Sequence, residues 1–194
     1  FTKKYSLSFH EITFSHMAAR LSGHVSKCIF SFVQDYKKTK ENFPELELPS
    51  SEEKDEFAKM ISSAAKKYRI PLQTCAVKED YSELGIKKEG CITLRELGRA
   101  NKLEFKNLRH SGMRAGCLCM KSSDIGSYDS CPAGCRYCYA TENFEKAKEN
   151  HAHHNPASSI LLGHIAETDK ISFAKQVSFL KEKELQMELF KEIL

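Results

Sequence analysis

The sequence predicts an α/β protein built from parallel β/α units, followed by a cysteine-rich metal-binding loop region. Segments with helical periodicity alternate with short, apolar, β-branched segments in the order helix, strand, helix, strand. Five of the eight cysteines fall between residues 117 and 138. We therefore expect β/α units in residues 1–108 and a cluster-binding segment with C-terminal helices in residues 109–194.

The first expected helix covers about residues 8–22, with Ser8 as a suitable N-cap and Gly23 as a suitable stop. Its apolar residues recur with helical spacing and would form one stripe, made of Phe9, Ile12, Met17 and Leu21. The segment 25–33 is β-branched, aromatic and mostly apolar, which predicts a buried strand. A polar loop with two prolines follows this strand.

A second helix is expected at about 51–67, because Ser50 and Glu53 form a capping-box pattern at its start. The second expected strand is "RIPLQTCAV", residues 69–77. The regular pattern fades after residue 79, where we expect only a short helix that ends near Gly98.

The remaining chain divides into a loop-rich part and two expected helices. Residues 109–140 are rich in Gly, Ser, Asp and Cys and lack periodicity, so this segment would need a metal centre to hold it together. Residues 143–152, "NFEKAKENHA", are expected to be helical, and residues 173–193 are expected to form a charged amphipathic helix.

Composition limits the class of protein. The net charge of +4 is too small to indicate nucleic-acid or membrane-surface binding by itself. No apolar run approaches the roughly 18 residues that a membrane span requires, and the start of the chain lacks a signal-peptide core. Because the chain begins with Phe1, we expect a fragment or a processed product. We expect a soluble, cytoplasmic protein with no membrane partner.

The cysteines indicate metal binding. In a secreted chain such crowding would suggest disulfides, but without an export signal thiols held as metal ligands are the better interpretation. Structural zinc favours pairs of cysteines separated by a longer span. The triplet Cys131, Cys135 and Cys138 instead has the spacing C-x-x-x-C-x-x-C, which is typical of a [4Fe–4S] cluster with one open iron.

The triplet, with Tyr137 before its third cysteine, is similar to the signature of radical S-adenosylmethionine (SAM) enzymes. Four segments resemble one family, the domain of unknown function numbered 1848: "SFVQDYKKT" (31–39), "LQTCA" (72–76), "GCLCMKSSDIGSYDSCPAGCRYCYA" (116–140) and "HNPASSILLG" (154–163). The resemblance covers most of residues 5–180. Family members carry a further N-terminal portion, so this chain looks like their C-terminal part.

The resemblance implies an iron–sulfur protein on a TIM-barrel-like scaffold, and a radical-SAM-like enzyme with an unknown substrate. In such enzymes the three cysteines, here Cys131, Cys135 and Cys138, bind three irons, and SAM binds the fourth. Tyr137 would lie where an aromatic residue approaches the adenine. One electron, supplied by a donor such as a ferredoxin or flavodoxin, then splits SAM to a 5′-deoxyadenosyl radical that abstracts hydrogen from the substrate.

The other cysteines leave two arrangements open. If Cys117 or Cys119 is a fourth ligand of the triplet cluster, no iron is open and the centre is structural or transfers electrons. If the triplet stands alone, a second, fully ligated cluster could be held by Cys75, Cys91, Cys117 and Cys119. Cys75 ends a predicted strand, where parallel folds place their sites. Cys28 lies inside an apolar strand and is expected to belong to the core.

Two other functions are compatible with the same residues. One is a non-catalytic, ferredoxin-like or structural iron–sulfur protein, which the adjacent C-x-C pair favours. The other is a zinc-stabilised nucleic-acid-binding module, which rests on the cysteines and the nearby lysines and arginines, although the modest charge argues against it. Asp35 and Tyr36 follow the first expected strand, where a barrel site would gather polar groups.

Overall fold

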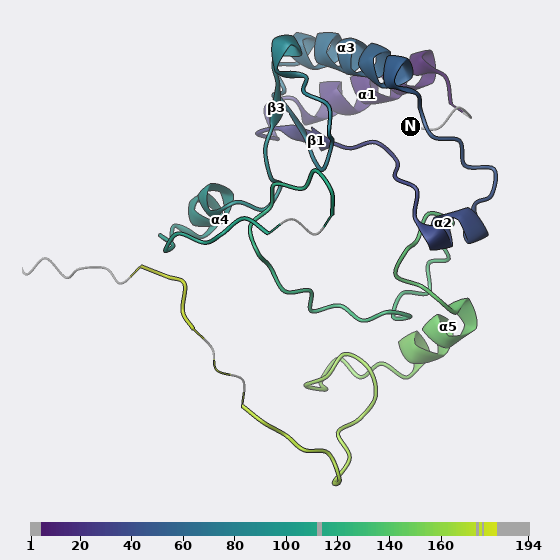
Figure 1. The fold of residues 1–194 in the computed structure, drawn as a ribbon, viewed down its shortest axis with the longest axis vertical. Coiled ribbons are helices and arrows are strands. Elements are labelled where there is room, and N and C mark those ends of the chain that lie inside the picture. Colours follow the sequence, from purple (N-terminus) through teal and green to yellow (C-terminus); the bar gives the residue numbers. More distant parts are fainter. Residues whose placement is uncertain (1–4, 112–113, 174, 176, 182–194) are drawn as a thin grey trace, which may run out of the picture.

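The computed structural model describes residues 5–111, 114–173, 175 and 177–181. Its helices and strands are, in chain order, α1 (Leu7–Leu21), β1 (Cys28–Phe30), α2 (Lys37–Asn42), α3 (Ser51–Lys67), β2 (Leu72–Thr74), the 3₁₀ helix η1 (Ser82–Leu84), β3 (Ile86–Lys88), α4 (Leu94–Asn101) and α5 (Phe144–Ala152) (Figure 1).

The expected α/β class is confirmed, but the described residues form no closed barrel. Their sheet is open and has three short parallel strands in the order β1–β2–β3. Cys28 pairs with Leu72, and Leu72 pairs with Ile86. A closed TIM barrel needs eight parallel strands. Among the described residues, three strands of three residues each leave both edges of the sheet without a further partner strand.

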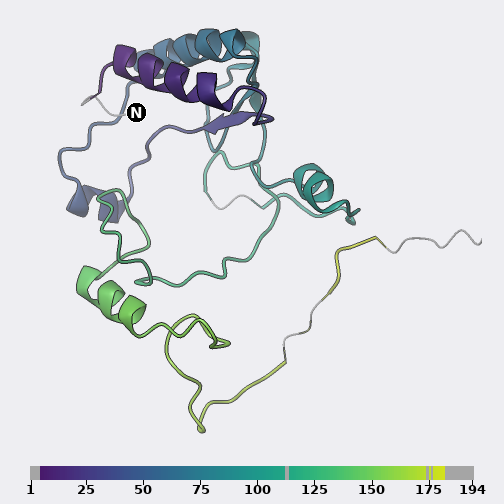
Figure 2. The same cartoon turned by 180° about the vertical axis from the view of Figure 1, so that it is seen from behind.

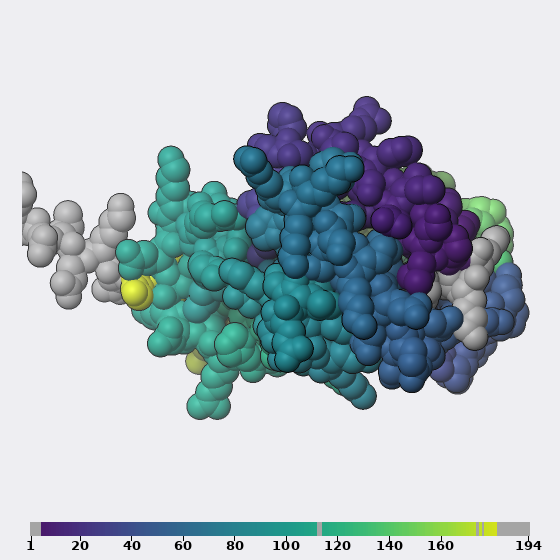
Figure 3. Space-filling model, turned by 90° about the horizontal axis from the view of Figure 1, so that it is seen from above, coloured from purple at the N-terminus to yellow at the C-terminus, as the bar shows by residue number. Residues whose placement is uncertain are grey.

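Helices α1 and α3 lie side by side along the sheet, as Figures 1 and 2 both show. Seen from above, their side chains cover this end of the molecule (Figure 3). The core lies between α3 and the sheet and consists of Phe32, Ala58, Ile61, Ala65, Leu72, Val77, Tyr81 and Ile86. Burial of each large apolar side chain contributes about 1.5–3 kcal/mol. Cys28 packs against this core, as its apolar strand predicts.

Helix α3 agrees with its sequence prediction. The Ser50 side chain accepts a hydrogen bond from the backbone N–H of Glu53 at 3.2 Å, and the Glu53 carboxylate accepts one from the backbone N–H of Ser50 at 2.8 Å. This capping box satisfies two donors at the helix start. The start of the helix is therefore encoded within four residues.

Helix α1 differs from its prediction in cap and in buried face. It begins at Leu7, and Ser6, not Ser8, accepts the hydrogen bond from Phe9 N–H. The expected apolar stripe is exposed: it comprises Phe9, Ile12, Met17 and Leu21. The buried face follows a row with a spacing of four, formed by His10, Phe14 and Ala18. Residues four apart share a helix face, and the small side chain of Ala18 permits a close approach.

The prediction missed three elements, α2, η1 and β3, and ended one helix too early. The segments α2 ("KKTKEN"), η1 ("SEL") and β3 ("IKK") are too polar and too short to show periodicity. Helix α4 continues through Gly98 to Asn101 and ends at Lys102, which has a left-handed φ of 54°. A Cβ on Gly98 would lie 2.7 Å from the carbonyl oxygen of Leu103, so this glycine permits a close backbone approach inside the helix.

Helix α5 confirms the expectation for residues 143–152, with Asn143 as its N-cap. The amphipathic helix expected at 173–193 falls largely outside the described residues. Those of its residues that are described, up to residue 181, are not helical, and Leu180 forms an antiparallel bridge with Phe105. None of the described helices has the length and apolar character that crossing a membrane requires.

Candidate functional site

Three cysteines from separate chain segments meet at the carboxyl edge of the sheet. Cys75 directly follows β2 and Cys91 follows β3, so the parallel pairing of these strands brings both to one edge. The Sγ atoms of Cys75 and Cys91 are 3.7 Å apart, and those of Cys91 and Cys119 are 3.3 Å apart. We call Cys75, Cys91 and Cys119 the edge thiols.

A small antiparallel pairing brings Cys119 to this edge. Ser111 N–H donates to the carbonyl of Cys119 at 3.1 Å, and Met120 N–H donates to the carbonyl of Ile92 at 3.1 Å. Gly90 makes room for this segment, because a Cβ there would lie only 2.4 Å from the carbonyl oxygen of Leu118. Any side chain at residue 90 would therefore push the segment away from Cys91.

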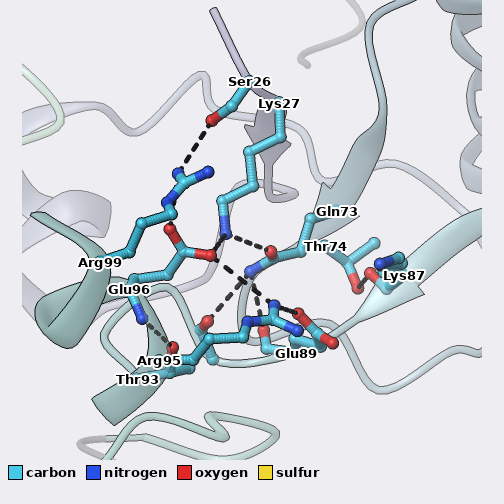
Figure 4. Close-up of polar contacts among 11 residues, drawn as sticks. Ser26, Lys27, Gln73, Thr74, Lys87, Glu89, Thr93, Arg95, Glu96 and Arg99 are labelled. Carbon is cyan, nitrogen blue, oxygen red and sulfur yellow. Dashed lines mark hydrogen bonds and ion pairs between the residues drawn. The ribbon is translucent and has the colours of Figure 1, made fainter. Parts of the chain in front are cut away.

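A buried glutamine fixes the segment that carries Cys91 (Figure 4). The Gln73 side chain is 1% exposed, and its amide nitrogen donates to the carbonyls of Glu89 at 3.2 Å and Gly90 at 3.1 Å. Its amide oxygen accepts from Lys27 Nζ at 2.9 Å. Ion pairs surround this centre and link Lys27 to Glu96, Arg95 to Glu89, and Arg99 to Glu96. These contacts hold the β3–α4 connection against β2.

The edge thiols perturb one another's pKa values. Burial, together with hydrogen bonding to Cys119 and Cys75, raises the pKa of Cys91 to about 12. Burial opposes ionisation of Cys119 as well, but hydrogen bonds from the Ile92 backbone and from the Cys91 and Cys117 thiols outweigh it and lower the pKa of Cys119. Cys119 is therefore the favoured thiolate of this pair, and Cys117 lies close enough to support it.

A polar network leads from the edge thiols to the triplet. The Arg114 guanidinium lies 4.0 Å from Cys75 Sγ and donates to the Tyr36 hydroxyl at 2.9 Å. Tyr36 in turn donates to the Gln34 side-chain oxygen at 2.9 Å. The Tyr137 hydroxyl accepts from the backbone N–H of Gln34 at 2.8 Å and donates to the Gln34 carbonyl at 2.9 Å. These contacts join the segment after β1 to both groups of cysteines.

The triplet lies in a loop that Asp129 braces. The Asp129 side chain is buried, and its carboxylate accepts from the backbone N–H groups of Glu142 at 2.5 Å and Asn143 at 2.9 Å. The Asp129 carbonyl accepts from the Asn150 side chain at 2.7 Å. Asp129 also has a left-handed φ of 54°, which Asp tolerates better than most residues. These bonds tie the start of the loop to α5.

The triplet sulfurs face solvent more than the edge thiols do. Cys131 and Cys135 are exposed and Cys138 is half-buried, and no contact joins the three sulfurs in the described chain. A hydrogen bond with Thr141, at 3.5 Å between Sγ and Oγ1, lowers the pKa of Cys138. A lowered pKa favours the thiolate, which is the form that binds metal.

A pocket of about 440 Å³ adjoins the triplet. Its lining includes Asn42, Ala133, Gly134, Cys135, Arg136, Cys138, Thr141, Glu142 and Phe144. Arg136 ties this wall to the region of α2, because its guanidinium pairs with Glu45 at 2.5 Å and lies 4.3 Å from the centre of the Phe43 ring. A Cβ on Gly134 would lie 3.0 Å from the Phe144 ring, so glycine keeps this wall open.

Comparison with known protein families shows which family the chain belongs to. Residues 1–140 match the family model described as "Domain of unknown function (DUF1848)". The chain belongs to this family. All eight cysteines of this DUF1848 chain lie within the matched region. No curated protein and no solved structure matches it.

The structure of this DUF1848 chain separates the predicted site residues into two groups. Cys75, Cys91 and Cys119 come together, and Cys117 lies next to Cys119. Cys131, Cys135, Tyr137 and Cys138 form a separate loop. In the described part of the chain, no group of three or more His, Cys, Asp or Glu side chains is arranged so that it could hold a metal ion with its present conformations.

Several residues that position the cysteines could not be predicted from the DUF1848 sequence. Gln34 and Thr141 have no sequence pattern that marks them, although Thr141 lies only three residues after its partner Cys138. For Gln73 there is a sequence signal: a glutamine stands in a mostly apolar segment, and buried polar groups need hydrogen-bond partners.

Asp35, which the sequence placed among the polar groups after the first expected strand, forms an exposed ion pair with Lys40 at 2.8 Å.

Proposed function

We propose that this chain is a radical-SAM-like iron–sulfur protein. Cys131, Cys135 and Cys138 would bind a [4Fe–4S] cluster that leaves one iron open for SAM. The observation that carries this proposal is the triplet spacing beside a pocket of about 440 Å³ that Cys135 and Cys138 both line. When bound, such a cluster supplies the electron that cleaves SAM, and the chain's residues position both groups.

The placement of Cys119 favours an open iron over a fully ligated cluster. In the electron-transfer alternative Cys117 or Cys119 closes the triplet cluster, but Cys119 Sγ contacts Cys91 at 3.3 Å. Because Cys117 precedes Cys119 by two residues, we assign both to the side of Cys91, which leaves the triplet with three thiolates. Arg136 and Lys38 lie beside the triplet, where they pair with Glu45 and Glu142, and Lys38 also lowers the pKa of Cys138. Each cation would share its positive charge between its carboxylate partner and the nearby thiolates.

We also propose a scaffold, a cellular compartment and an electron donor for this protein. The open parallel sheet would be one part of a TIM-barrel-like scaffold, with the cysteines at the carboxyl edge where such folds bind ligands. Eight free cysteines suit a reducing, cytoplasmic compartment. A ferredoxin or flavodoxin would supply the electron, and the substrate would enter beside the triplet loop.

Anaerobic reconstitution tests this proposal. The full chain, loaded with iron and sulfide, should hold about four irons at the triplet, and the EPR signal of the reduced cluster should change when SAM is added. Cys135→Ala should remove this signal, whereas Cys28→Ala should keep it because Cys28 packs against the core. Full iron and an unchanged spectrum in Cys135→Ala would refute the ligand assignment. An EPR spectrum that does not change when SAM is added would favour the electron-transfer alternative.

A further inference from the structure

The edge thiols are the closest group of sulfurs in the described chain. Cys91 Sγ contacts both Cys75 Sγ at 3.7 Å and Cys119 Sγ at 3.3 Å. They come from three segments, after β2, after β3 and from the loop 114–121. Gln73 and Gly90 hold these segments together. Three thiols that only filled space in the core would not need these supporting contacts. The buried amide and the glycine therefore indicate that the three cysteines are held together as a site.

The separations of the sulfurs indicate what they would bind. Around one tetrahedral zinc ion, with Zn–S bonds of about 2.3 Å, thiolate sulfurs lie about 3.8 Å apart. In a [4Fe–4S] cluster each thiolate binds a different iron, so the sulfurs stand farther apart than around one ion. The 3.3 and 3.7 Å separations fit the single ion.

We propose that Cys75, Cys91, Cys117 and Cys119 bind one zinc ion through four thiolates. Cys117 is the fourth ligand because it lies two residues before Cys119 in the same C-x-C segment. The four side chains must turn toward a common point, since in the described residues they do not yet surround one. Cys91 Sγ already contacts the sulfurs of both Cys75 and Cys119.

The charge and burial of the site suit this ion. Four thiolates around Zn²⁺ carry a net charge of −2, and the Arg114 guanidinium lies 4.0 Å from Cys75 Sγ to offset part of it. Cys119 is only 4% exposed and the other three cysteines are half-buried. A four-thiolate zinc has no open coordination position, which makes the site structural. It would clamp β2, β3 and the loop 114–121 together.

This site is independent of the iron cluster proposed above, so metal analysis of matched variants separates the two. The full chain, purified without oxygen, should contain about one zinc bound by four sulfurs in X-ray absorption spectra. Cys119→Ser should lose at least most of the zinc and keep the iron of the triplet. Cys135→Ala should show the reverse, and Cys28→Ser should keep both metals.

The result can overturn either proposal separately. About eight irons and no zinc in the wild-type chain would replace the zinc site with a second cluster. Zinc retained in Cys119→Ser but lost in Cys135→Ala would place it at the triplet instead. If Cys119→Ser does not fold, Cys117→Ser, which alters a half-buried position, gives the same readout, and the sulfur count in wild-type spectra remains decisive.

Discussion

The Tyr137 hydroxyl holds the backbone of Gln34 at two points, although 103 residues separate them in the sequence. It accepts a hydrogen bond from Gln34 N–H at 2.8 Å and donates one to the Gln34 carbonyl at 2.9 Å. The triplet loop is thereby fastened to the segment that follows β1. The resemblance to radical SAM enzymes implies an adenine contact for Tyr137, but these two hydrogen bonds give it a positioning role that does not depend on any ligand.

Replacing Tyr137 by Phe should loosen this junction. The change removes both hydrogen bonds and keeps the ring, so we expect a loss of about 1–2 kcal/mol in the free energy of unfolding. Hydrogen exchange of the Gln34 amide should become faster. Tyr139→Phe is the control, because the described chain shows no hydrogen bond from its hydroxyl. Unchanged protection of Gln34 would show that the contact is not maintained in solution.

Replacing Asp129 by Asn should alter the dependence of stability on pH. Hydrogen bonds from the backbone of Asn143 and then of Glu142 lower the pKa of Asp129. A lowered pKa means that the ionised carboxylate stabilises the fold above the unfolded value of about 3.9, and that this stability is lost as pH falls through the folded value. Asn tolerates the left-handed φ, so the backbone conformation is kept.

The melting temperatures of the wild type and of Asp129→Asn are expected to converge as the pH falls. Asp129→Asn should melt at a lower temperature than the wild type at pH 7, and the two melting temperatures should approach each other as pH falls below about 4. Both proteins are measured with a chelator, so that metal loss does not contribute. Glu167→Gln, which changes an exposed carboxylate, should follow the wild type. A constant difference between pH 7 and pH 3 would argue against the role of this carboxylate.

Replacing Gly90 by Ala should separate the edge thiols. The new methyl group would lie 2.4 Å from the carbonyl oxygen of Leu118, a backbone atom that can move only with its segment. Cys119, now 4% exposed, should then react faster with a thiol reagent, as mass spectrometry of the labelled protein can show. Gly126→Ala is the matched control, because its nearest contact is the side chain of Asp124. Equal labelling in both variants would contradict the proposed contact.

Replacing Gln73 by Leu should cost more than a typical change in a strand. The carbonyls of Glu89 and Gly90 would lose their donor inside the protein, and an unsatisfied buried polar group costs about 1–3 kcal/mol. We expect a decrease of about 2–3 kcal/mol in the free energy of unfolding by urea. Lys87→Gln, at an exposed position of the neighbouring strand, should change it by less than about 0.5 kcal/mol. An unchanged free energy of unfolding in Gln73→Leu would mean that water takes over the hydrogen bonds that the Gln73 amide makes.

Local patterns in the sequence were sufficient for the helices α3 and α5 and for the parallel β/α class. The capping box of α3 lies within four consecutive residues, so its hydrogen bonds do not depend on distant contacts. The strands β1 and β2 were predicted because each lies in a short, mostly apolar segment, residues 25–33 and 69–77. The division of the cysteines into a triplet and scattered thiols was also visible in their spacing alone.

The tertiary structure decided which face of α1 is buried, where β3 pairs and which cysteines meet. The exposed stripe of α1 and its buried row both have helical spacing, and only the position of α3 selects between them. Cys91 and Cys119 are 28 residues apart, and their contact depends on the β2–β3 register, on the Gln73 amide and on the space left by Gly90. Each of these is a contact between distant segments, which local sequence patterns do not encode. The sequence by itself determined that the chain has a β/α part and a cysteine triplet beside scattered cysteines, and the packing of distant segments determined which of the scattered cysteines meet.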